Sequence, residues 1–572
     1  RCGASATGRV PRRIPFSAGF YTGAPDGEAS AQRGIAGAIA GVPASARTCG
    51  RRKPGCENVV RRLAGRAAAQ GSPAQRHAGR GRAAGAVHFP RRAAVSARKV
   101  PGQSATGSSP ERGPASGGPH RQEAGTNNRN TMSFNIPRTP QRRVVIIGGG
   151  FAGVKLARRL RRSDYQVVLV DRNNYHQFQP LIYQVASAGL EPSSISFPFR
   201  RIFRKQRDFH FRMAEAQAVD PQRNTLRTSI GSLEYDELVL AAGTTTNFYG
   251  NEHLRSHALP MKSVAEATAL RNTLLTNFER ALTSSSERER DELLNVVVAG
   301  GGATGVEIAG ALAEMKRFVL PRDYPDLPAE RMRIHLVEAG DRLLAGMSAP
   351  SSDAARRFLS RMGVEILLGK KVTDYRDRSV VFDDGSGLPS LTFIWVSGVE
   401  AERIGDEGLL PTGRGGRIRV DAFNRVEGYD NIYAIGDQCI LRGDPDYPDG
   451  HPQLAQPAIQ QGERLADNLC RKASGRPMVP FRYRNPGVMA TVGRNRAVAE
   501  IGKLRIDGWA AWTMWLVVHL RSILGVKNRI IVFVNWVWNY FTYDQSLRLI
   551  LRAGRDGTAP QTDGMPCAPT EK

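Results

Sequence analysis

One segment near residue 150 constrains the fold more than any other: an apolar run, a glycine cluster and a helix follow in direct succession. The apolar run Val144–Ile147 leads into the spacing G-x-G-x-x-G, and helical periodicity follows. The fingerprint glycines are Gly148, Gly150 and Gly153. Such glycines permit a tight turn that brings backbone N–H groups close to a pyrophosphate. The next apolar run, Gln166–Val170, ends on Asp171, whose carboxylate can bind a ribose diol, so the segment predicts a dinucleotide-binding βαβ unit.

The same pattern occurs a second time later in the chain. Strand residues Val296–Ala299 precede a glycine turn, and we expect a helix from Val306 to about Phe318. The glycines of this copy are Gly300, Gly302 and Gly305. The following strand, Ile334–Val337, ends on Glu338, and this carboxylate would repel a 2′-phosphate. The repeat therefore predicts two dinucleotide sites, the second of which favours NADH over NADPH.

Two further strands indicate how the units are arranged in an α/β fold. Glu234–Ala242 runs into Gly243, and Asn431–Ile435 runs into Gly436 and Asp437. We expect both strands to return to the sheet of the first unit, so the second unit interrupts the first. The predicted first nucleotide-binding domain comprises residues 140–257 and 401–500, and the predicted second comprises residues 258–400.

Most of the positive charge lies before Met132. That stretch carries 22 Lys and Arg against 5 Asp and Glu, which is +17 of the total +28. It lacks apolar periodicity, so we expect residues 1–131 to be a disordered basic extension. It is a basic tail, a targeting segment or an upstream reading frame translated in error ahead of Met132, and we favour the last. Because the remainder is only modestly basic, we expect no nucleic-acid partner.

The cysteines exclude one class of enzyme. They lie at Cys2, Cys49, Cys56, Cys439, Cys470 and Cys567. No two of them after Met132 have the close spacing that a dithiol–disulfide reductase needs, and this usage favours a reducing compartment. The sequence also shows no metal-ligand constellation and no nucleophilic triad, so we expect no metal site.

The chain after residue 500 differs from everything before it. Its tryptophans are Trp509, Trp512, Trp515, Trp536 and Trp538, in two apolar runs separated by residues 525–529. Each run is shorter or more interrupted than the about 20 apolar residues of a spanning helix. Arg521, Lys527 and Arg529 could lie among anionic headgroups while the apolar faces enter the membrane interface. We expect membrane-associating helices over 501–552 and a disordered tail over 553–572; a dimer interface or a buried helical hairpin is the alternative.

From about Arg142 to Leu551 the chain resembles the two-dinucleotide-binding-domain flavoproteins, and within them the type II (alternative) NADH:quinone oxidoreductases. The double fingerprint and the segments Leu240–Thr244 and Tyr433–Asp437 carry the general resemblance. The segments Tyr175–Ala186 and Ala455–Gln461 carry the specific one. The resemblance implies non-covalent FAD in the first domain, NADH as the substrate of the second and C-terminal amphipathic helices on a membrane face.

The resemblance also implies roles for single residues. It places Gly243 at the flavin, Asp437 on the flavin ribityl chain, and Gln456 and Gln460 as amide donors to a quinone. It suggests Gly398 as a nicotinamide-side contact, although Ser397 stands where the family usually has alanine. Glu307 lies in the first turn of the second fingerprint helix, where a carboxylate complements the helix dipole. Its alternative role is a contact with the nicotinamide carboxamide or the supply of a proton.

The function that follows from the resemblance is electron transfer from NADH through FAD to a membrane quinone. The sequence shows no set of membrane-embedded ionisable residues, so we expect no proton pumping. The expected location is peripheral, on the cytoplasmic face of a bacterial inner membrane, and a homodimer through the C-terminal helices is compatible with it. Two alternatives remain: a soluble reductase of a protein acceptor such as ferredoxin, and a flavin-bearing NADH sensor without steady turnover.

Overall fold

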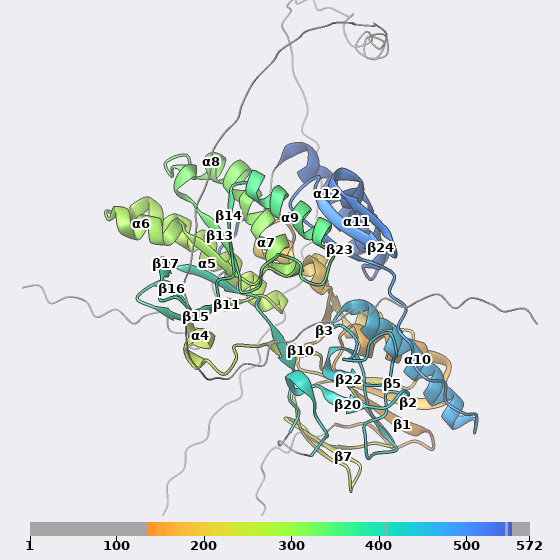
Figure 1. Ribbon diagram of the computed structural model, residues 1–572. Coiled ribbons are helices and arrows are strands. Elements are labelled where there is room, and N and C mark those ends of the chain that lie inside the picture. Colours follow the sequence, from red (N-terminus) through yellow and green to blue (C-terminus); the bar gives the residue numbers. More distant parts are fainter. Residues whose placement is uncertain (1–133, 406–408, 544–546, 552–572) are drawn as a thin grey trace, which may run out of the picture. The chain divides into compact units, whose positions relative to one another are not determined.

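A computed structural model describes residues 134–405, 409–543 and 547–551, which all belong to one compact unit of the chain (Figure 1). The basic extension predicted for residues 1–131 and the tail predicted for 553–572 lie outside the described residues. The described part is an α/β structure built on two parallel sheets, and this confirms the predicted fold class.

The first fingerprint lies in a five-stranded sheet of order β21-β9-β1-β2-β5, in which all neighbours are parallel. Its strands are β21 (Ile432–Ala434), β9 (Glu237–Leu240), β1 (Arg142–Ile147), β2 (Tyr165–Asp171) and β5 (Phe209–Met213). The central strands are buried on both faces, as is usual where helices cover a parallel sheet. Because β21 follows the whole second unit in the sequence, the first sheet takes strands from both sides of the insertion.

The second fingerprint lies in a sheet of the same form, of order β11-β18-β12-β13-β14 and again entirely parallel. Its strands are β11 (Leu259–Pro260), β18 (Thr392–Trp395), β12 (Val296–Ala299), β13 (Ile334–Glu338) and β14 (Val364–Leu368). The glycine turn follows the central strand in both sheets. The sequence repeat is therefore a repeat of sheet topology as well.

Two short segments connect the sheets. The chain leaves the first sheet through β10 (Thr244–Thr246) and returns through β19 (Val399–Ala401), and the two strands pair antiparallel. Phe248 and Leu254 already pack in the core cluster of the second sheet, so the crossing precedes residue 258, where sequence analysis placed the boundary. Paired crossing strands hold the two halves together at the edge where both glycine turns lie.

Short strands complete both halves. Three-stranded sheets are formed by β6 (Ala216–Asp220), β7 (Thr225–Thr228) and β8 (Gly231–Glu234), by β15 (Val372–Arg376), β16 (Ser379–Phe382) and β17 (Gly387–Pro389), and by β23 (Val488–Thr491), β24 (Ala497–Ile501) and β25 (Leu504–Asp507). Two-stranded pairs are β3 (Tyr175–Gln177) with β4 (Ser196–Pro198), and β20 (Ile418–Val420) with β22 (Cys439–Leu441). All of these pairings are antiparallel except that of β20 with β22, which is parallel.

Helices cover the sheets and fix the glycine turns. The fingerprint helices are α1 (Phe151–Arg159) and α7 (Ala303–Glu314), and a π-helical turn over Met315–Val319 follows α7. The others are α2 (Ile182–Ala186), α3 (Phe199–Ile202), α4 (Glu252–His257), α5 (Val264–Thr283), α6 (Glu287–Leu294), α8 (Leu320–Asp323), α9 (Ala349–Arg361) and α10 (Ala455–Ala473). A Cβ on Gly462 of α10 would lie 2.6 Å from the carbonyl oxygen of Ala152, so glycine allows α10 to approach α1 closely.

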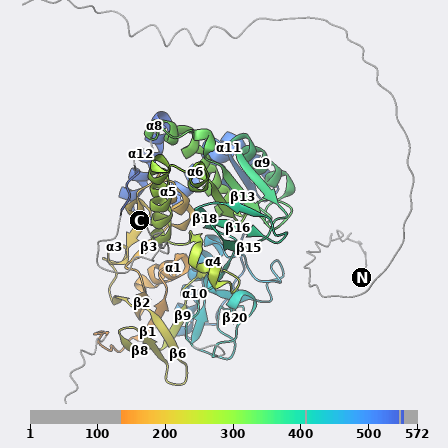
Figure 2. The same cartoon turned by 90° about the vertical axis from the view of Figure 1, so that its left-hand side faces the viewer.

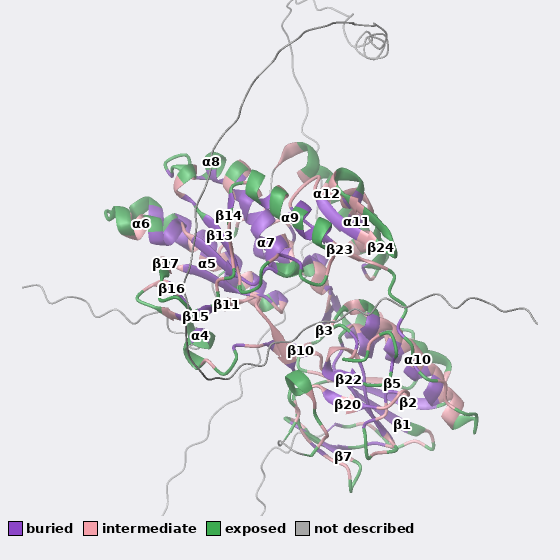
Figure 3. Ribbon diagram, in the orientation of Figure 1, coloured by how far each residue is buried: buried purple, intermediate pink, exposed green. Residues whose placement is uncertain are grey.

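The predicted C-terminal helices are present as α11 (Gly508–Ser522) and α12 (Val526–Thr542). In both views α11 lies beside α9 and the β23–β25 sheet (Figures 1 and 2). Trp515, Ile523 and Val532 are buried in the core cluster of the second half, so both helices are part of the folded body. Most of the remaining α12 surface is exposed or partly exposed (Figure 3).

Candidate active site

A cavity of about 1580 Å³ joins the carboxyl ends of the two sheets, the edge at which α/β sheets usually bind ligands. Both glycine turns, α10 and α11 contribute to its lining. The predicted site residues on its surface are Gly148, Gly150, Asp171, Gly243, Gly302, Glu307, Glu338, Asp437 and Gln456. Tertiary folding therefore brings the flavin-side, nicotinamide-side and quinone-side predictions to one cavity.

The two carboxylates predicted to bind ribose are held in the same way. Asp171 accepts hydrogen bonds from the N–H groups of Gly149 (2.6 Å) and Asn173 (2.7 Å). Glu338 accepts hydrogen bonds from the N–H groups of Gly301 (2.6 Å) and Gly340 (2.7 Å). Each carboxylate is thus fixed against its own glycine turn, and lone pairs remain for a ribose diol.

Three of the fingerprint glycines do not reach the cavity surface and act through backbone packing. A Cβ on Gly153 would lie 2.0 Å from the carbonyl oxygen of Gly148, and one on Gly305 would lie 1.8 Å from that of Gly300. Gly300 itself has φ +116°, and a Cβ there would lie 2.7 Å from the carbonyl oxygen of Val396. These glycines let each fingerprint helix start close to its strand, which sets the position of the turn.

The cavity fits two dinucleotides. Its volume exceeds the roughly 300–1,000 Å³ of an ordinary small-molecule pocket. Gly150 and Gly302 each leave open space where a Cβ would stand, and both precede a helix that has no side-chain N-cap. The free N–H groups of these helix ends suit the pyrophosphates of FAD and NADH.

Glu307 lines the cavity and is partly buried. Burial raises the pKa of Glu307 to about 8, and the N–H of Thr491, 3.5 Å away, opposes the rise only in part. The carboxyl group is therefore protonated at neutral pH. The predicted position in the first turn of the helix is wrong, because α7 begins at Ala303 and its first turn holds no acidic residue. A neutral group beyond the first turn gains little from the helix dipole, so the environment favours the predicted proton-supply role.

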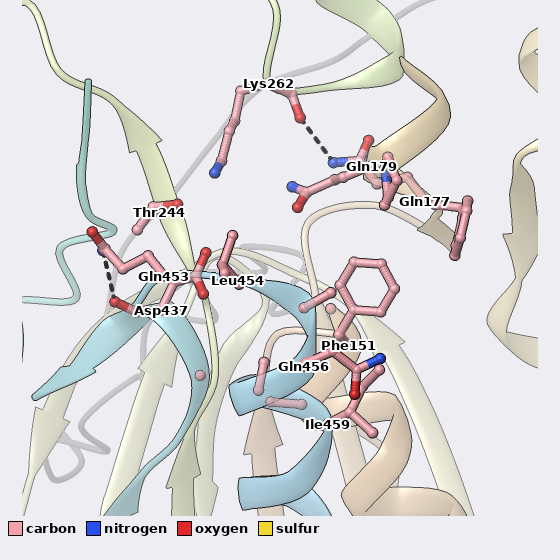
Figure 4. Close-up of a pocket in the computed structure, with 18 of the residues that line it drawn as sticks. Phe151, Gln177, Gln179, Thr244, Lys262, Asp437, Gln453, Leu454, Gln456 and Ile459 are labelled. Carbon is pink, nitrogen blue, oxygen red and sulfur yellow. Dashed lines mark hydrogen bonds between the residues drawn. The ribbon is translucent and has the colours of Figure 1, made fainter. Parts of the chain in front are cut away.

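Sequence analysis missed a cation in the cavity. Lys262 lies just before α5 and extends into the cavity on the side of Thr244 and Asp437 (Figure 4). Burial lowers the pKa of Lys262 and raises the pKa of Asp437, and the opposite charges of the two groups reduce both shifts. A lone lysine in a polar stretch gives no sequence signal, since only the fold brings it to Asp437.

The two predicted quinone-binding glutamines lie in different surroundings. Gln456 is exposed at the start of α10 and lies on the cavity surface (Figure 4). Gln460 does not line the cavity, because its amide donates to the carbonyl of Arg484 (2.9 Å) and accepts the N–H of the same residue (3.1 Å). Gln460 therefore fixes a loop, and the structure does not support its predicted contact with quinone.

Gly398 is also outside the cavity lining. Its carbonyl oxygen accepts the N–H of Asn247 (3.1 Å), and a Cβ at this position would lie 2.5 Å from the hydroxyl oxygen of Tyr249. The structure thus gives Gly398 a packing reason to be glycine, and the exposed Tyr249 covers it.

Two uncharged histidines form part of the cavity wall. The Nδ1 atoms of His176 and His519 lie 2.9 Å and 2.8 Å from the carbonyl oxygens of Gly149 and Trp515. Because a carbonyl only accepts, each Nδ1 carries the hydrogen. Burial lowers the pKa of both histidines to about 4, so both imidazoles stay neutral near pH 7.

The sequence matches two family models. The model described as pyridine nucleotide-disulphide oxidoreductase matches residues 142–462, and the model described as NDH2 C-terminal domain matches residues 486–543. The type II NADH:quinone oxidoreductase Ndh of Mycobacterium tuberculosis is 34% identical over 415 residues, which cover 70% of this chain and 88% of that protein. The chain belongs to the type II NADH:quinone oxidoreductase family.

More distantly similar proteins also match. The mitochondrial internal alternative NAD(P)H-ubiquinone oxidoreductase A1 of Arabidopsis thaliana is 29% identical, over 70% of this chain and 84% of its own. The structure of NDH2 from Plasmodium falciparum in complex with NADH has a TM-score of 0.67 at 20% identity, covering 72% of this chain and all of that one. The sulfide:quinone oxidoreductase of Aquifex aeolicus shares the fold more loosely, with a TM-score of 0.55, 18% identity and coverage of 70% and 96%.

The cysteines of this type II family member do not form a reductase pair in the described part of the chain. Cys439 is buried in β22, and burial raises the pKa of its thiol to about 11. Cys470 lies on a different element, α10. Neither lines the cavity. The match to a disulphide oxidoreductase model therefore reflects the shared two-domain fold.

Proposed function

We propose that the chain is an FAD-dependent NADH:quinone oxidoreductase that does not pump protons. One observation carries the proposal: a single cavity is lined by both ribose-binding carboxylates, by Gln456 and by Val518, His519 and Ser522 of α11. Such a cavity places two dinucleotides and a third, apolar substrate within reach of one another. Family membership supports the same reaction.

Bound FAD would supply the two-electron chemistry that connects NADH with a quinone. The chain supplies positions and charges for this chemistry. Asp171 and the first glycine turn would hold FAD, and Asp437 would hold its ribityl chain. Glu338 and the second turn hold NADH, and the carboxylate disfavours a 2′-phosphate. Lys262 adds a positive charge on the flavin side of the cavity.

Quinone reduction also consumes protons, and Glu307 is placed to supply one. Its carboxyl group holds a proton at neutral pH and lies on the cavity surface. The amide of Gln456 has no hydrogen-bond partner among the described residues and can donate to a quinone carbonyl. Glu307 thus acts as a proton donor, and Gln456 as a positioning contact.

The outer face of α11 and α12 supports attachment to one membrane face. Its exposed apolar residues are Trp509, Val517, Val518, Val526, Ile530, Phe533, Val534, Val537, Trp538 and Phe541. Large contiguous apolar surfaces of this kind mark interaction sites, and a membrane interface accepts tryptophan well. The cytoplasmic face of a bacterial inner membrane and the homodimer stay predictions.

No helix in the described ranges has the length and hydropathy needed to cross a bilayer.

The proposal is tested by steady-state oxidation of NADH with a short-chain quinone by the flavin-loaded protein. We expect Gln456→Ala to raise the KM for quinone about tenfold, because one hydrogen bond to the substrate is lost. Gln460→Ala is the matched control on the same helix. It should lower the melting temperature but leave the KM for quinone unchanged, because its amide binds only the backbone of Arg484.

Two results would contradict the proposal. One is reduction of a protein acceptor such as ferredoxin without reduction of quinone. The other is flavin reduction by NADH with no reoxidation on adding quinone, which would indicate a sensor. A pH gradient formed during turnover in sealed vesicles would contradict the absence of pumping.

A further inference from the structure

A second groove lies beside the C-terminal helices and encloses about 840 Å³. Residues of 189–202 form one wall, and the α11–α12 turn with α12 forms the other. It meets the active-site cavity at Arg158, Tyr175 and Leu524, which line both spaces. The other residues that line the groove do not line the active-site cavity, and of these only Lys527 and Trp538 have a role above, in membrane attachment.

The groove carries excess positive charge. Arg158, Arg201 and Lys527 line it, are exposed, and form no ion pair or side-chain hydrogen bond within the described part of the chain. The single carboxylate in the lining is Glu191. Three cations therefore face one anion.

Glu191 also interacts with a further cation, Arg271, which does not line the groove. Arg271 is buried, with 1% of its surface exposed, and its Nε and Nη2 have no hydrogen-bond partner. Burial lowers the pKa of Arg271, and the charge of Glu191 acts against this lowering. Because Glu191 is shared with Arg271, it compensates little of the charge on the groove cations.

Hydrogen bonds across the groove fix its walls. The Asn528 amide donates to the carbonyls of Ser193 and Ser194, both at 3.1 Å, and the Asn539 amide donates to that of Gly189 at 3.4 Å. The groove is therefore preformed, so a ligand need not order it. The first turn of α12 carries no side-chain cap and no acidic residue, which adds to the positive potential.

Apolar residues of α12 also line the groove, next to Asn535 and Asn539. They are Ile531 and Trp538, which follow Lys527 along the helix, and Trp538 is 58% exposed. The neighbouring outward face of the same helix carries Phe533 and Phe541, which are 52% and 75% exposed. A ligand that joins an anionic head to apolar chains matches this order of charge and apolar surface.

We propose that this groove binds one anionic phospholipid, with its phosphate among Arg158, Arg201 and Lys527 and an acyl chain along Ile531 and Trp538. This inference rests on the membrane attachment proposed above. Inorganic phosphate lacks the apolar part, and a zwitterionic phospholipid brings its own cation to a groove that already holds three. The lipid would fix α12 relative to the body of the enzyme at the membrane surface.

The test is native mass spectrometry of the flavin-loaded protein in detergent, titrated with phosphatidylglycerol or phosphatidylcholine. We expect one phosphatidylglycerol to bind, with phosphatidylcholine much weaker and millimolar inorganic phosphate unable to displace it. The double variant Arg201→Gln/Lys527→Gln should bind phosphatidylglycerol about 25-fold more weakly, since each cation at a membrane surface contributes about fivefold in affinity. Arg158 is left intact because it also lines the active-site cavity.

A second double variant, Lys503→Gln/Arg505→Gln, removes the same charge from exposed positions outside the groove and should keep the affinity within about twofold. Equal weakening of both variants, equal binding of phosphatidylcholine, or displacement by phosphate would overturn the proposal. Quinone reduction is measured on the same samples. Selective lipid binding without quinone reduction would contradict only the proposed function. Quinone reduction without selective lipid binding would contradict only the proposed lipid site in the groove.

Discussion

At the scale of single residues, the site depends on charged groups whose surroundings change their chemistry. Asp171 and Glu338 are anchored by backbone N–H groups, so their position follows from the glycine turns. Glu307 and Lys262 have no such anchor in their own segments. Burial keeps Glu307 neutral, and Lys262 lies close enough to Asp437 for their charges to interact. These two groups therefore determine where a proton and a positive charge lie in the cavity.

The substitution Glu307→Gln keeps the shape of the side chain and removes the titration. The turnover number with quinone should fall above about pH 8 in the wild type, because the ionised carboxylate cannot donate a proton. This high-pH limb should be absent in Glu307→Gln, whose turnover number at pH 7 should be lower by on the order of 10². The test is the turnover number measured across the pH range for both proteins. If Glu307→Gln shows the same fall at high pH as the wild type, another group supplies the proton.

The same group links stability to pH. The folded state holds the Glu307 proton with a pKa of about 8, against an ordinary value of 4.5, so the stabilisation is complete below about pH 4.5 and is lost as the pH rises through about 8. Thermal unfolding of Glu307→Gln should lose this part of the pH dependence. Flavin content measured in parallel confirms that both proteins are compared in the loaded form.

At the scale of elements, α11 and α12 have two different faces. The inner face contributes Trp515, Ile523 and Val532 to the core, and the indole N–H of Trp536 donates to Gln184 at 2.9 Å. The outer face is apolar and exposed. The helices are thus integral to the fold on one side and available to a membrane on the other, which combines the membrane-helix prediction with part of its buried-hairpin alternative.

We expect Phe533→Asp/Phe541→Asp to weaken binding to vesicles at least about tenfold, because each exposed phenylalanine would bury its ring in the membrane interface. Activity with a soluble quinone should persist, since neither residue lines the active-site cavity. Leu282→Asp is the control, an exposed apolar position on α5 at 37% exposure. Co-sedimentation with vesicles measures the effect, and equal loss in the control would point to general charge effects.

At the scale of the whole molecule, two copies of one sheet topology share one cavity. Each copy has its glycine turn after the central strand and its carboxylate after the next. The paired crossing strands β10 and β19 join the copies beside these turns. Two sites that could each bind a dinucleotide alone are thereby placed for transfer between their ligands.

This arrangement predicts different effects for equivalent substitutions in the two copies. Gly153→Ala places a Cβ 2.0 Å from the carbonyl oxygen of Gly148, and we expect purified protein largely free of flavin and lower in melting temperature. Gly305→Ala places one 1.8 Å from that of Gly300, and we expect flavin-loaded protein with a KM for NADH raised at least about tenfold. Flavin absorbance and stopped-flow reduction distinguish the two, and identical behaviour would contradict separate sites.

The sequence by itself determined the local units. A glycine turn, its strands and the closing carboxylate lie within about 30 residues, and backbone geometry restricts which residues can occupy them, so both fingerprints could be predicted. Only the tertiary structure decided which side chains face the cavity. Gln456 and Gln460 lie one turn apart on α10, yet the backbone of Arg484 occupies the second amide. Lys262 lies near enough to Asp437 for their charges to interact, and Arg158, Arg201 and Lys527 line one groove, although long stretches of sequence separate them. Burial and charge at these places depend on what packs around each group, and residue patterns record only its immediate neighbours along the chain.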